Sequence, residues 1–362
     1  MPALLEAKQF VALHAVHMGL RPPFLDGVLQ RIVSLGGEEP GSWVNEWSAE
    51  AEAALRSRDE RTAANLYNLA RFPVADSQAK THAARSCADA LGRWLKTNRA
   101  GERRVAVVNG HEVAFLFNAP KRPDAPLVVL IGGIVSLKEQ WSSFLTLGPR
   151  LGCAVAIADF PGVGENHIPY SRDAAAVFGT IMNATRHDCD VRRTLIVAPS
   201  FGGHLAILYA QADRRIRGIV TVGAPLTQFF TDTNVRSAMP EITRSALQHV
   251  SGVEADALDN HLTALALRPS ELSRLHAPVT YIASLRDEII PQSDWGEATR
   301  VSPKLRVYAF NDVHGAPHHL RETRLLILST LLRHAGRKRL GRLVEQFFRM
   351  KARLGSTHPQ SA

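Results

Sequence analysis

The N-terminal part of the chain carries hydrophobic residues at helical spacing. Ala53 to Phe72 is rich in Ala, Leu, Arg and Glu, which are good helix formers. A later stretch places apolar and small residues on one helix face, at Ala84, Cys87, Ala88, Leu91, Trp94 and Leu95. No alternating run of β-branched residues occurs before residue 103. We therefore predict an all-α cap domain over residues 1–97.

Beyond this point the pattern changes to short apolar runs separated by polar segments. Arg104–Val108 and Val113–Phe117 flank Asn109-Gly110, a dipeptide that favours the type I′ turn of a β-hairpin. Six further runs follow, at Leu127–Ile131, Cys153–Ala158, Thr194–Ala198, Ile216–Val222, Val279–Ala283 and Leu305–Phe310. Short buried strands that alternate with helices indicate a parallel sheet covered on both faces. We predict an α/β domain over residues 98–335 whose eight-stranded sheet is mostly parallel.

Two segments do not fit this alternation. Residues 225–275 are too long for a simple strand crossover, so we expect a helical insertion over the C-terminal edge of the sheet. Residues 336–362 place apolar side chains among arginines, at Leu340, Leu343, Val344, Phe347, Phe348 and Met350, which predicts a basic amphipathic helix and tail. This helix either packs on the body with a solvated basic face or docks an acidic carrier protein or an anionic membrane.

The positive charge of the chain is concentrated in that last segment. Eight basic residues and a single acid, Glu345, fall between Arg333 and Arg353, which gives this stretch a charge of +7. The remainder carries only +2 of the total of +9. Because the main body is nearly neutral, we expect no nucleic-acid partner.

The composition is that of an ordinary soluble globular protein, with 45% hydrophobic and 21% charged residues. Cys87, Cys153 and Cys189 are widely spaced, which argues against a disulfide framework or a zinc site and favours a reducing cytoplasm. No signal-peptide core and no apolar window of about 18 residues is present, so we expect no transmembrane segment. We also expect no metal or cofactor, and we leave a homodimer open.

A serine stands between the apolar run that ends at Ala198 and a predicted helix over Leu205–Ala210. The intervening Pro-Ser-Phe-Gly-Gly places Ser200 at a sharp strand-to-helix turn, which is the pattern of a nucleophile elbow. Gly202 and Gly203 supply room where strand and helix come close. The usual pattern is G-x-S-x-G, and Ala198 takes its first position. The alternative is that Ser200 only caps the helix.

Two further residues follow later predicted strands. Asp287 comes after the run Val279–Ala283, and His314 comes after the last run. The carboxyl ends of parallel strands meet at one edge of a sheet, and the chain order Ser, Asp, His is the one expected for a hydrolase built on such a sheet. We therefore predict that Ser200 is a nucleophile, that His314 activates it and that Asp287 orients the histidine.

Neighbouring residues offer alternatives for two of these roles. His318 and His319 are close to His314, but we expect them inside the following helix. Glu288 and Asp312 are alternatives to Asp287. Glu288 is one residue too late to share the direction of Asp287, and we expect Asp312 to face away.

Glycines after the first central strand predict an oxyanion hole. Gly132 and Gly133 let the main chain approach a substrate, so that the amide of Gly133 or Ile134 can act together with that of Phe201. A dinucleotide site is excluded because G-x-G-x-x-G is absent. The glycines of Asp159–Glu165 are not followed by GK[ST], so we expect a structural turn at the pocket border rather than a phosphate loop.

These motifs together resemble one branch of the α/β-hydrolases. It contains the dihydroxypseudooxynicotine hydrolases, the fermentation-respiration switch esterases and the fungal hydrolases that shorten polyketides in pigment pathways. Trp47, Ala51 and Ala63–Phe72 with Tyr67 resemble the helical N-terminal domain of this branch, and Gly132–Glu139 resembles its GG-x-D-S-x-K-E oxyanion loop. The resemblance covers nearly the whole chain up to about residue 335. Val135 departs from it, because that loop often has Asp there.

The resemblance implies a cleft between cap and core that takes a small-molecule carbonyl substrate. With the predicted residues, it favours a serine hydrolase that cleaves an ester, a thioester or an activated carbon–carbon bond through an acyl-enzyme. An acyltransferase, cyclase or chain-releasing thioesterase acting on a polyketide-type acyl chain would use the same residues while excluding water. A non-catalytic regulatory protein with a relic site is a third interpretation.

Overall fold

The computed structural model describes residues 2–355 and contains one eight-stranded sheet with the order β1-β2-β4-β3-β5-β6-β7-β8. The strands are β1 Glu102–Val108, β2 His111–Asn118, β3 Pro126–Ile131, β4 Ala154–Ala158, β5 Asp190–Val197, β6 Ile216–Val222, β7 Val279–Ser284 and β8 Leu305–Phe310. Strands β3 to β8 are paired in parallel, whereas β2 runs antiparallel to both β1 and β4. The predicted eight-stranded, mostly parallel α/β fold is confirmed.

The hairpin at the start of the sheet closes as its sequence predicts. Val108 pairs with His111, which leaves Asn109 and Gly110 as a two-residue loop. Both loop residues have positive φ, 50° and 84°, the geometry that a type I′ turn requires. Asn and Gly adopt it at low cost, so the local sequence sets the register of β1 against β2.

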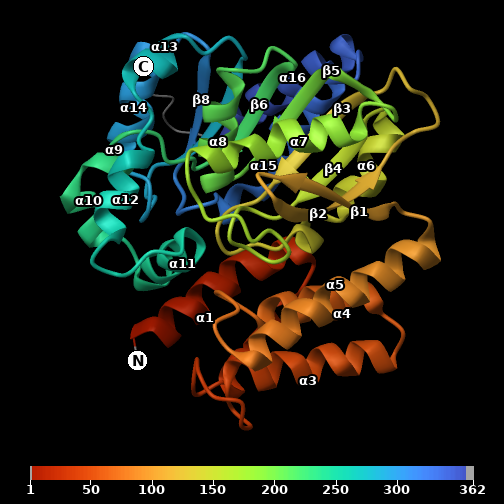
Figure 1. Cartoon of the computed structure of the whole chain (residues 1–362), viewed down its shortest axis with the longest axis vertical. Helices are drawn as coiled ribbons and strands as arrows, with labels where there is room; N and C mark the ends of the chain where they lie inside the picture. Colours follow the sequence, from red (N-terminus) through yellow and green to blue (C-terminus); the bar gives the residue numbers. More distant parts are fainter. Residues whose placement is uncertain (1, 356–362) are drawn as a thin grey trace.

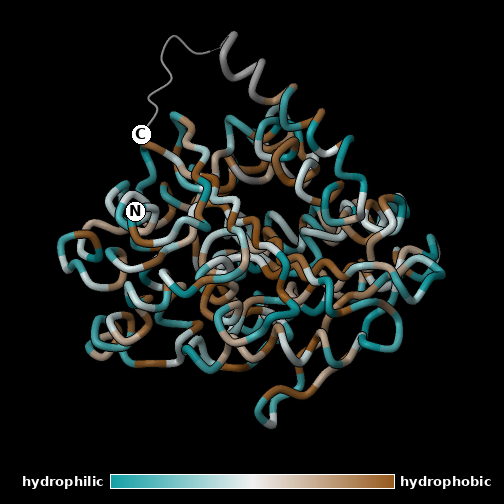
Figure 2. The backbone as a smooth tube through the Cα atoms, turned by 90° about the horizontal axis from the view of Figure 1, so that it is seen from above, coloured by the Kyte–Doolittle hydropathy of each residue, from teal (hydrophilic) through white to brown (hydrophobic). Residues whose placement is uncertain are grey.

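Six longer helices pack around the sheet: α6 Ser143–Leu151, α7 Ala176–Thr185, α8 Phe201–Ala210, α14 Gln292–Val301, α15 Leu320–His334 and α16 Lys338–Gly355. Figure 1 shows α7 and α8 in front of the sheet and α16 behind it. The central strand β3 is buried at every position, as expected for a strand covered on both faces. In Figure 2 the hydrophobic segments gather in the middle of the molecule and the hydrophilic segments at its periphery.

The N-terminal region consists of helices that lie along the lower side of the sheet in Figure 1. They are α1 Pro2–His14, α2 Pro22–Arg31, α3 Trp43–Arg56, α4 Glu60–Ala70 and α5 Gln78–Asn98. The stretch Ala53 to Phe72, which is rich in good helix formers, contains the end of α3 and the whole of α4. Arg58 follows the end of α3 with a φ of 62°, and the Asp59 side chain accepts a hydrogen bond from the Thr62 amide and caps α4.

The segment between β6 and β7 forms short helices: α9 Gln228–Thr231, α10 Thr233–Ala238, α11 Glu241–Ser251, α12 Leu258–Leu265 and α13 Pro269–Ser273. Asp294 holds the start of this insertion, because its carboxylate accepts hydrogen bonds from the amides of Leu226, Thr227 and Gln228. Burial raises the pKa of Asp294 to about 6 although these amides favour its charged form. At the other side, Glu6 of α1 accepts a hydrogen bond from the Ile242 amide of α11.

The C-terminal helix packs on the body of the protein. Phe348 is buried with Val222, Ile282 and Leu326, and Glu345 pairs with Arg333 at 2.7 Å. Phe348 therefore attaches α16 to the body, whereas Leu340, Leu343 and Phe347, which the sequence places on its apolar side, are exposed. The docking of an acidic partner or a membrane on this helix stays a prediction. The rest of the predicted tail, residues 356–362, lies outside the described residues. Among the helices of residues 2–355, none is long and apolar enough to cross a membrane.

Candidate active site

Ser200 lies at the junction between β5 and α8, in a strained main-chain conformation. Its φ of 53° and ψ of −134° fall in a region that side-chain-bearing residues rarely occupy. The Ser200 amide is fixed by a 2.7 Å hydrogen bond to the main-chain oxygen of Val222. Helix α8 begins directly at Phe201, four residues earlier than the apolar pattern predicts. A Cβ on Gly202 would lie 2.5 Å from the main-chain oxygens of Ile131 and Gly132, so only glycine fits there.

The structure brings Ser200, His314 and Asp287 into one hydrogen-bonded chain. Ser200 Oγ lies 3.0 Å from His314 Nε2, and His314 Nδ1 lies 3.0 Å from each carboxylate oxygen of Asp287. The amides of Ile289 and Ile290 donate to Asp287 Oδ1 and hold the carboxylate in place. Three residues from three loops at one edge of the sheet thus meet with the geometry of a nucleophile, a base and an orienting acid.

The environment of His314 favours its charged form. The ring is buried, which alone would lower its pKa, but the Asp287 carboxylate outweighs this effect through its charge and its hydrogen bond. The charge of Glu288 adds to the same direction. The pKa of His314 is therefore raised above its ordinary value, so an imidazolium formed in this position is stabilised.

Gly223, directly after β6, gives His314 and Asp287 the space they occupy. It has a φ of 60°, and a Cβ there would lie 2.9 Å from His314 Cε1 and 3.3 Å from Asp287 Oδ2. Both the main-chain conformation and the close approach therefore require glycine. No sequence motif marks Gly223, and its position at the end of a central strand is the only signal in the sequence.

The alternative acids and bases have other partners. His318 and His319 lie in a 3₁₀ turn before α15, not inside that helix as predicted, and both rings contact the Asp312 carboxylate, at 2.7 and 2.8 Å. Asp312 is thus engaged away from His314. Glu288 does face the histidine loop, contrary to expectation, because its carboxylate accepts a hydrogen bond from the His314 amide.

The loop after β3 brings main-chain amides next to Ser200. The Gly133 amide already donates to Ser136 Oγ at 3.1 Å. The amides of Ile134 and Phe201 donate no hydrogen bond to any acceptor among residues 2–355. Of the three predicted oxyanion donors, these two are therefore the ones whose N–H groups are available.

Ion pairs of the buried Lys138 hold the loop after β3 on its sheet side. Lys138 Nζ lies 2.8 Å from Glu139, 2.9 Å from Asp159 and 2.7 Å from Glu165, and Asp159 also accepts a hydrogen bond from the Lys138 amide. Burial alone would lower the pKa of Lys138, but the three carboxylates raise it well above its usual range. The Asp159–Glu165 turn holds this loop, and none of its residues lines the active-site cavity.

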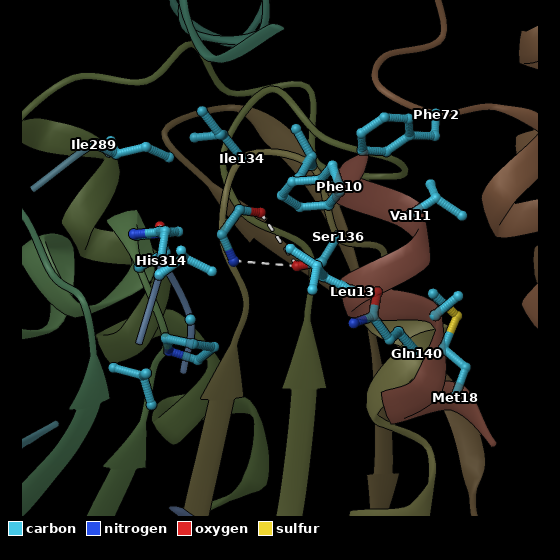
Figure 3. Close-up of a pocket in the computed structure, with 18 of the residues that line it drawn as sticks. Phe10, Val11, Leu13, Met18, Phe72, Ile134, Ser136, Gln140, Ile289 and His314 are labelled. Atoms are coloured by element: carbon cyan, nitrogen blue, oxygen red, sulfur yellow. Dashed lines mark hydrogen bonds between the residues drawn. The ribbon is translucent and has the colours of Figure 1, made fainter. Parts of the chain in front are cut away.

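A cavity of about 820 Å³ opens above Ser200 and His314. Its walls come from α1, α4, the loop after β3, α11 and α15, and most of the lining is apolar. Figure 3 shows Phe10, Leu13 and Phe72 on its N-terminal side, with Ile289 and His314 on the opposite side. Pockets of this size and character hold small organic molecules. Among residues 2–355, no group of three or more His, Cys, Asp or Glu side chains is arranged to hold a metal ion.

Comparison with known proteins identifies the family. The family model described as "Esterase FrsA-like" matches residues 33–301, well over half of the chain. The chain belongs to the FrsA-like esterase family. Esterase FrsA of Vibrio cholerae serotype O1 (strain ATCC 39541 / Classical Ogawa 395 / O395) is 23% identical over 286 residues, which cover 71% of this chain and 68% of the relative. Esterase FrsA of Escherichia coli O139:H28 (strain E24377A / ETEC) is 24% identical over 308 residues, which cover 77% and 74%.

Two solved structures are also similar to this FrsA-like chain. "AbyA5 Wildtype" is 36% identical with a TM-score of 0.90 and covers 96% of this chain and 99% of its own. The 2,6-dihydroxy-pseudo-oxynicotine hydrolase, at 20% identity and a TM-score of 0.69, covers 89% of this chain and 93% of its own and shares the fold. This FrsA-like chain is therefore an α/β-hydrolase enzyme of the branch that its sequence motifs resemble.

Part of the cavity of this FrsA-like esterase lies outside the region that the family model matches. The matched region starts at residue 33, whereas α1 and the turn after it supply Phe10, Leu13 and Met18 to the cavity wall. From the sequence, these residues were predicted only to belong to a helical cap. Their role as cavity wall depends on how α1 is placed against α11, and no local motif encodes that.

Arg71 connects the helical region of this FrsA-like chain to the loop beside Ser200. The residue is 2% exposed at the end of α4, and its Nη2 donates to the main-chain oxygen of Val135. Burial lowers the pKa of Arg71 to about 10, a value at which the group is still charged at neutral pH. The loop is therefore held from the helical side by Arg71 and from the sheet side by Lys138.

Proposed function

We propose that the chain is a serine esterase in which Ser200 attacks the carbonyl carbon of an ester that carries a large apolar group. The observation that carries the proposal is the continuous hydrogen-bonded chain from Ser200 through His314 to Asp287 at the floor of an apolar cavity of about 820 Å³. A serine hydroxyl is a weak nucleophile alone, and such a chain is the arrangement that activates it.

The reaction proceeds in two halves. His314 Nε2 takes the proton from Ser200 Oγ as the oxygen bonds to the carbonyl carbon, and the imidazolium then gives this proton to the departing alkoxide. The acyl group stays on Ser200 until a water molecule, deprotonated by His314, attacks it and releases the acid. Asp287 keeps the Nδ1–H tautomer of His314 and stabilises the imidazolium, in agreement with its raised pKa.

The negative oxygen of the tetrahedral intermediate is held by the amides of Phe201 and Ile134. Phe201 is the first residue of α8, so the positive end of the helix dipole supports the same charge. The Gly133 amide has Ser136 Oγ as its acceptor, and we assign it to shaping the loop. Fixed donors of this kind are worth about 10²–10³ in rate for each hydrogen bond.

A fluorophosphonate probe tests the nucleophile. The wild-type protein should be labelled, and Ser200→Ala should not be. Ser245→Ala is a matched control, because Ser245 is exposed on α11 and lies outside the cavity lining. Labelling of Ser200→Ala at the wild-type rate would contradict the proposal.

The size of the cavity supports acyl transfer or cyclisation as a second candidate. A space of about 820 Å³ with mostly apolar walls holds both an acyl chain and an attacking group of the substrate, while disfavouring water. The two candidates differ in what releases the acyl-enzyme. Turnover in ¹⁸O-labelled water distinguishes them, since hydrolysis places the label in the product acid and transfer to a substrate nucleophile does not.

A further inference from the structure

A line of hydrogen bonds runs from the buried guanidinium of Arg71 to the wall of the active-site cavity. Arg71 Nε and Nη2 donate to Asn68 Oδ1 at 3.2 and 2.8 Å, and Asn68 Nδ2 donates to Gln140 Oε1 at 3.2 Å. Gln140 lines the cavity. Figure 3 shows Gln140 and His314 on opposite sides of the cavity, with Ser136 between them.

This line fixes the orientation of two side-chain amides. A guanidinium has only donors, so the atom that it contacts on Asn68 must be the oxygen. The Asn68 nitrogen is then the group that faces Gln140, which makes the oxygen of Gln140 the acceptor. The remaining Gln140 group is Nε2, a donor. Gln140 Nε2 has no hydrogen-bond acceptor among residues 2–355, and it is not one of the buried polar atoms without a partner.

We propose that Gln140 is a specificity residue that requires a hydrogen-bond acceptor, such as a carbonyl oxygen, in the part of the substrate remote from the scissile bond. The proposal rests on the proposed function only in taking the substrate to bind this cavity. In surroundings as apolar as Leu13 and Met18, an N–H donor that a ligand covers without accepting from it loses its hydrogen bonds to water. A fully apolar chain at this place is therefore disfavoured.

The buried charge of Arg71 makes the arrangement rigid. Asn68 is 3% exposed and Arg71 is 2% exposed, and the guanidinium donates to the neutral oxygens of Asn68, Pro73 and Val135. With no carboxylate hydrogen-bonded to it in the described part of the chain, Arg71 holds Asn68 Oδ1 strongly. Reversal of the Gln140 amide would set Nε2 against Asn68 Nδ2, donor against donor, so the donor stays directed at the substrate.

The experiment compares nitrophenyl octanoate with a series of nitrophenyl oxo-octanoates, in which a single keto group is moved along the acyl chain. At one keto position, wild-type kcat/KM should exceed that for the plain ester by about three- to tenfold, the range for one neutral hydrogen bond. Gln140→Leu should bring this ratio close to one. Gln30→Leu, at an exposed site on α2 outside the lining, should keep the wild-type ratio.

A second variant reverses the Gln140 amide without removing it. In Asn68→Asp the new carboxylate still accepts from Arg71 but offers no donor, so Gln140 turns its Nε2 toward this carboxylate and presents Oε1 to the cavity. The keto preference should vanish, and hydroxy-octanoate esters, which can donate, should become preferred over their keto counterparts. An unchanged keto preference in both Gln140→Leu and Asn68→Asp would overturn the proposal, as would a wild-type ratio of one at every keto position.

Binding to Ser200→Ala separates this proposal from the esterase mechanism. The same ester pairs are titrated calorimetrically into that variant, and the keto ester should again bind about three- to tenfold more tightly. If Ser200→Ala still hydrolyses esters at the wild-type rate, the assignment of the nucleophile fails while the Gln140 ratio remains measurable. If the variant is inactive and binds all esters equally, the Gln140 proposal alone fails.

Discussion

The guanidinium of Arg71 donates a hydrogen bond to the main-chain oxygen of Val135, so α4 of the helical region holds the loop that faces Ser200. Inside this loop, the Ser136 amide donates to the Gly133 oxygen and closes a tight turn that leaves the Ile134 amide free. The branch that the sequence resembles often has Asp where this chain has Val135.

Replacement of Arg71 should act on catalysis more than on substrate binding. In Arg71→Met the loop loses its contact from the helical side, so the Ile134 amide is less well placed, and kcat on a plain ester should fall about tenfold or more with a smaller change in KM. Inhibition by a trifluoromethyl ketone, which forms an oxyanion adduct on serine, should weaken in parallel. Arg85→Met, at an exposed site on α5, serves as the control. A change confined to KM would argue that Arg71 only shapes the cavity.

The pH dependence of the proposed esterase activity should follow from the charge around His314. The ring must be neutral to accept the Ser200 proton, so kcat/KM should fall as pH decreases through its pKa. Because that pKa is raised, the fall should begin above about 6.5, the ordinary value for histidine. Glu288→Gln removes one carboxylate that raises the pKa, and the midpoint should move to lower pH. Glu254→Gln, exposed and remote in sequence, should leave the midpoint unchanged.

Gly223→Ala should disturb the pairing of His314 with Asp287. The added Cβ would lie 2.9 Å from the imidazole, and the φ of 60° strains any side-chain-bearing residue. We expect kcat to fall by about 10² or more, since small displacements of catalytic groups have effects of this size. Gly252→Ala is a matched control, because its φ of 65° is similar but its Cβ would meet nothing within 4 Å. Equal losses of activity in the two variants would attribute the effect to main-chain strain alone.

The C-terminal helix should contribute to stability through Phe348. This side chain is 5% exposed against Val222 and Ile282, so Phe348→Ala should reduce the free energy of unfolding by about 3–5 kcal/mol. Leu343→Ala, on the same helix but 60% exposed, should change it by less than about 0.5 kcal/mol. Urea denaturation measures both. If Phe348→Ala lowered the free energy of unfolding as little as Leu343→Ala, α16 would not contribute to the stability of the body.

Features that depend on local periodicity and local main-chain geometry were predictable from the amino-acid sequence. Runs of apolar residues predicted six of the eight strands, and Asn109-Gly110 with its flanking segments predicted the hairpin of the other two. The short Pro-Ser-Phe-Gly-Gly stretch placed Ser200 at a sharp turn for the same reason: few residues tolerate that conformation or that close approach. Asp287 and His314 were predicted from the rule that parallel strands end at one edge, and the structure places both within hydrogen-bond distance along one chain of contacts with Ser200.

The residues that surround that edge of the sheet are brought together by long-range packing. Arg71 and Val135 are 64 residues apart, and Asn68 and Gln140 are 72 residues apart, so no periodic pattern relates them. Likewise, α1 becomes a cavity wall because it packs against α11. Such contacts arise from the burial of large apolar surfaces, which is non-directional and leaves no motif in the sequence. Local rules therefore located the proposed nucleophile, whereas the packing of distant helices decided the shape and the polar groups of the cavity above it.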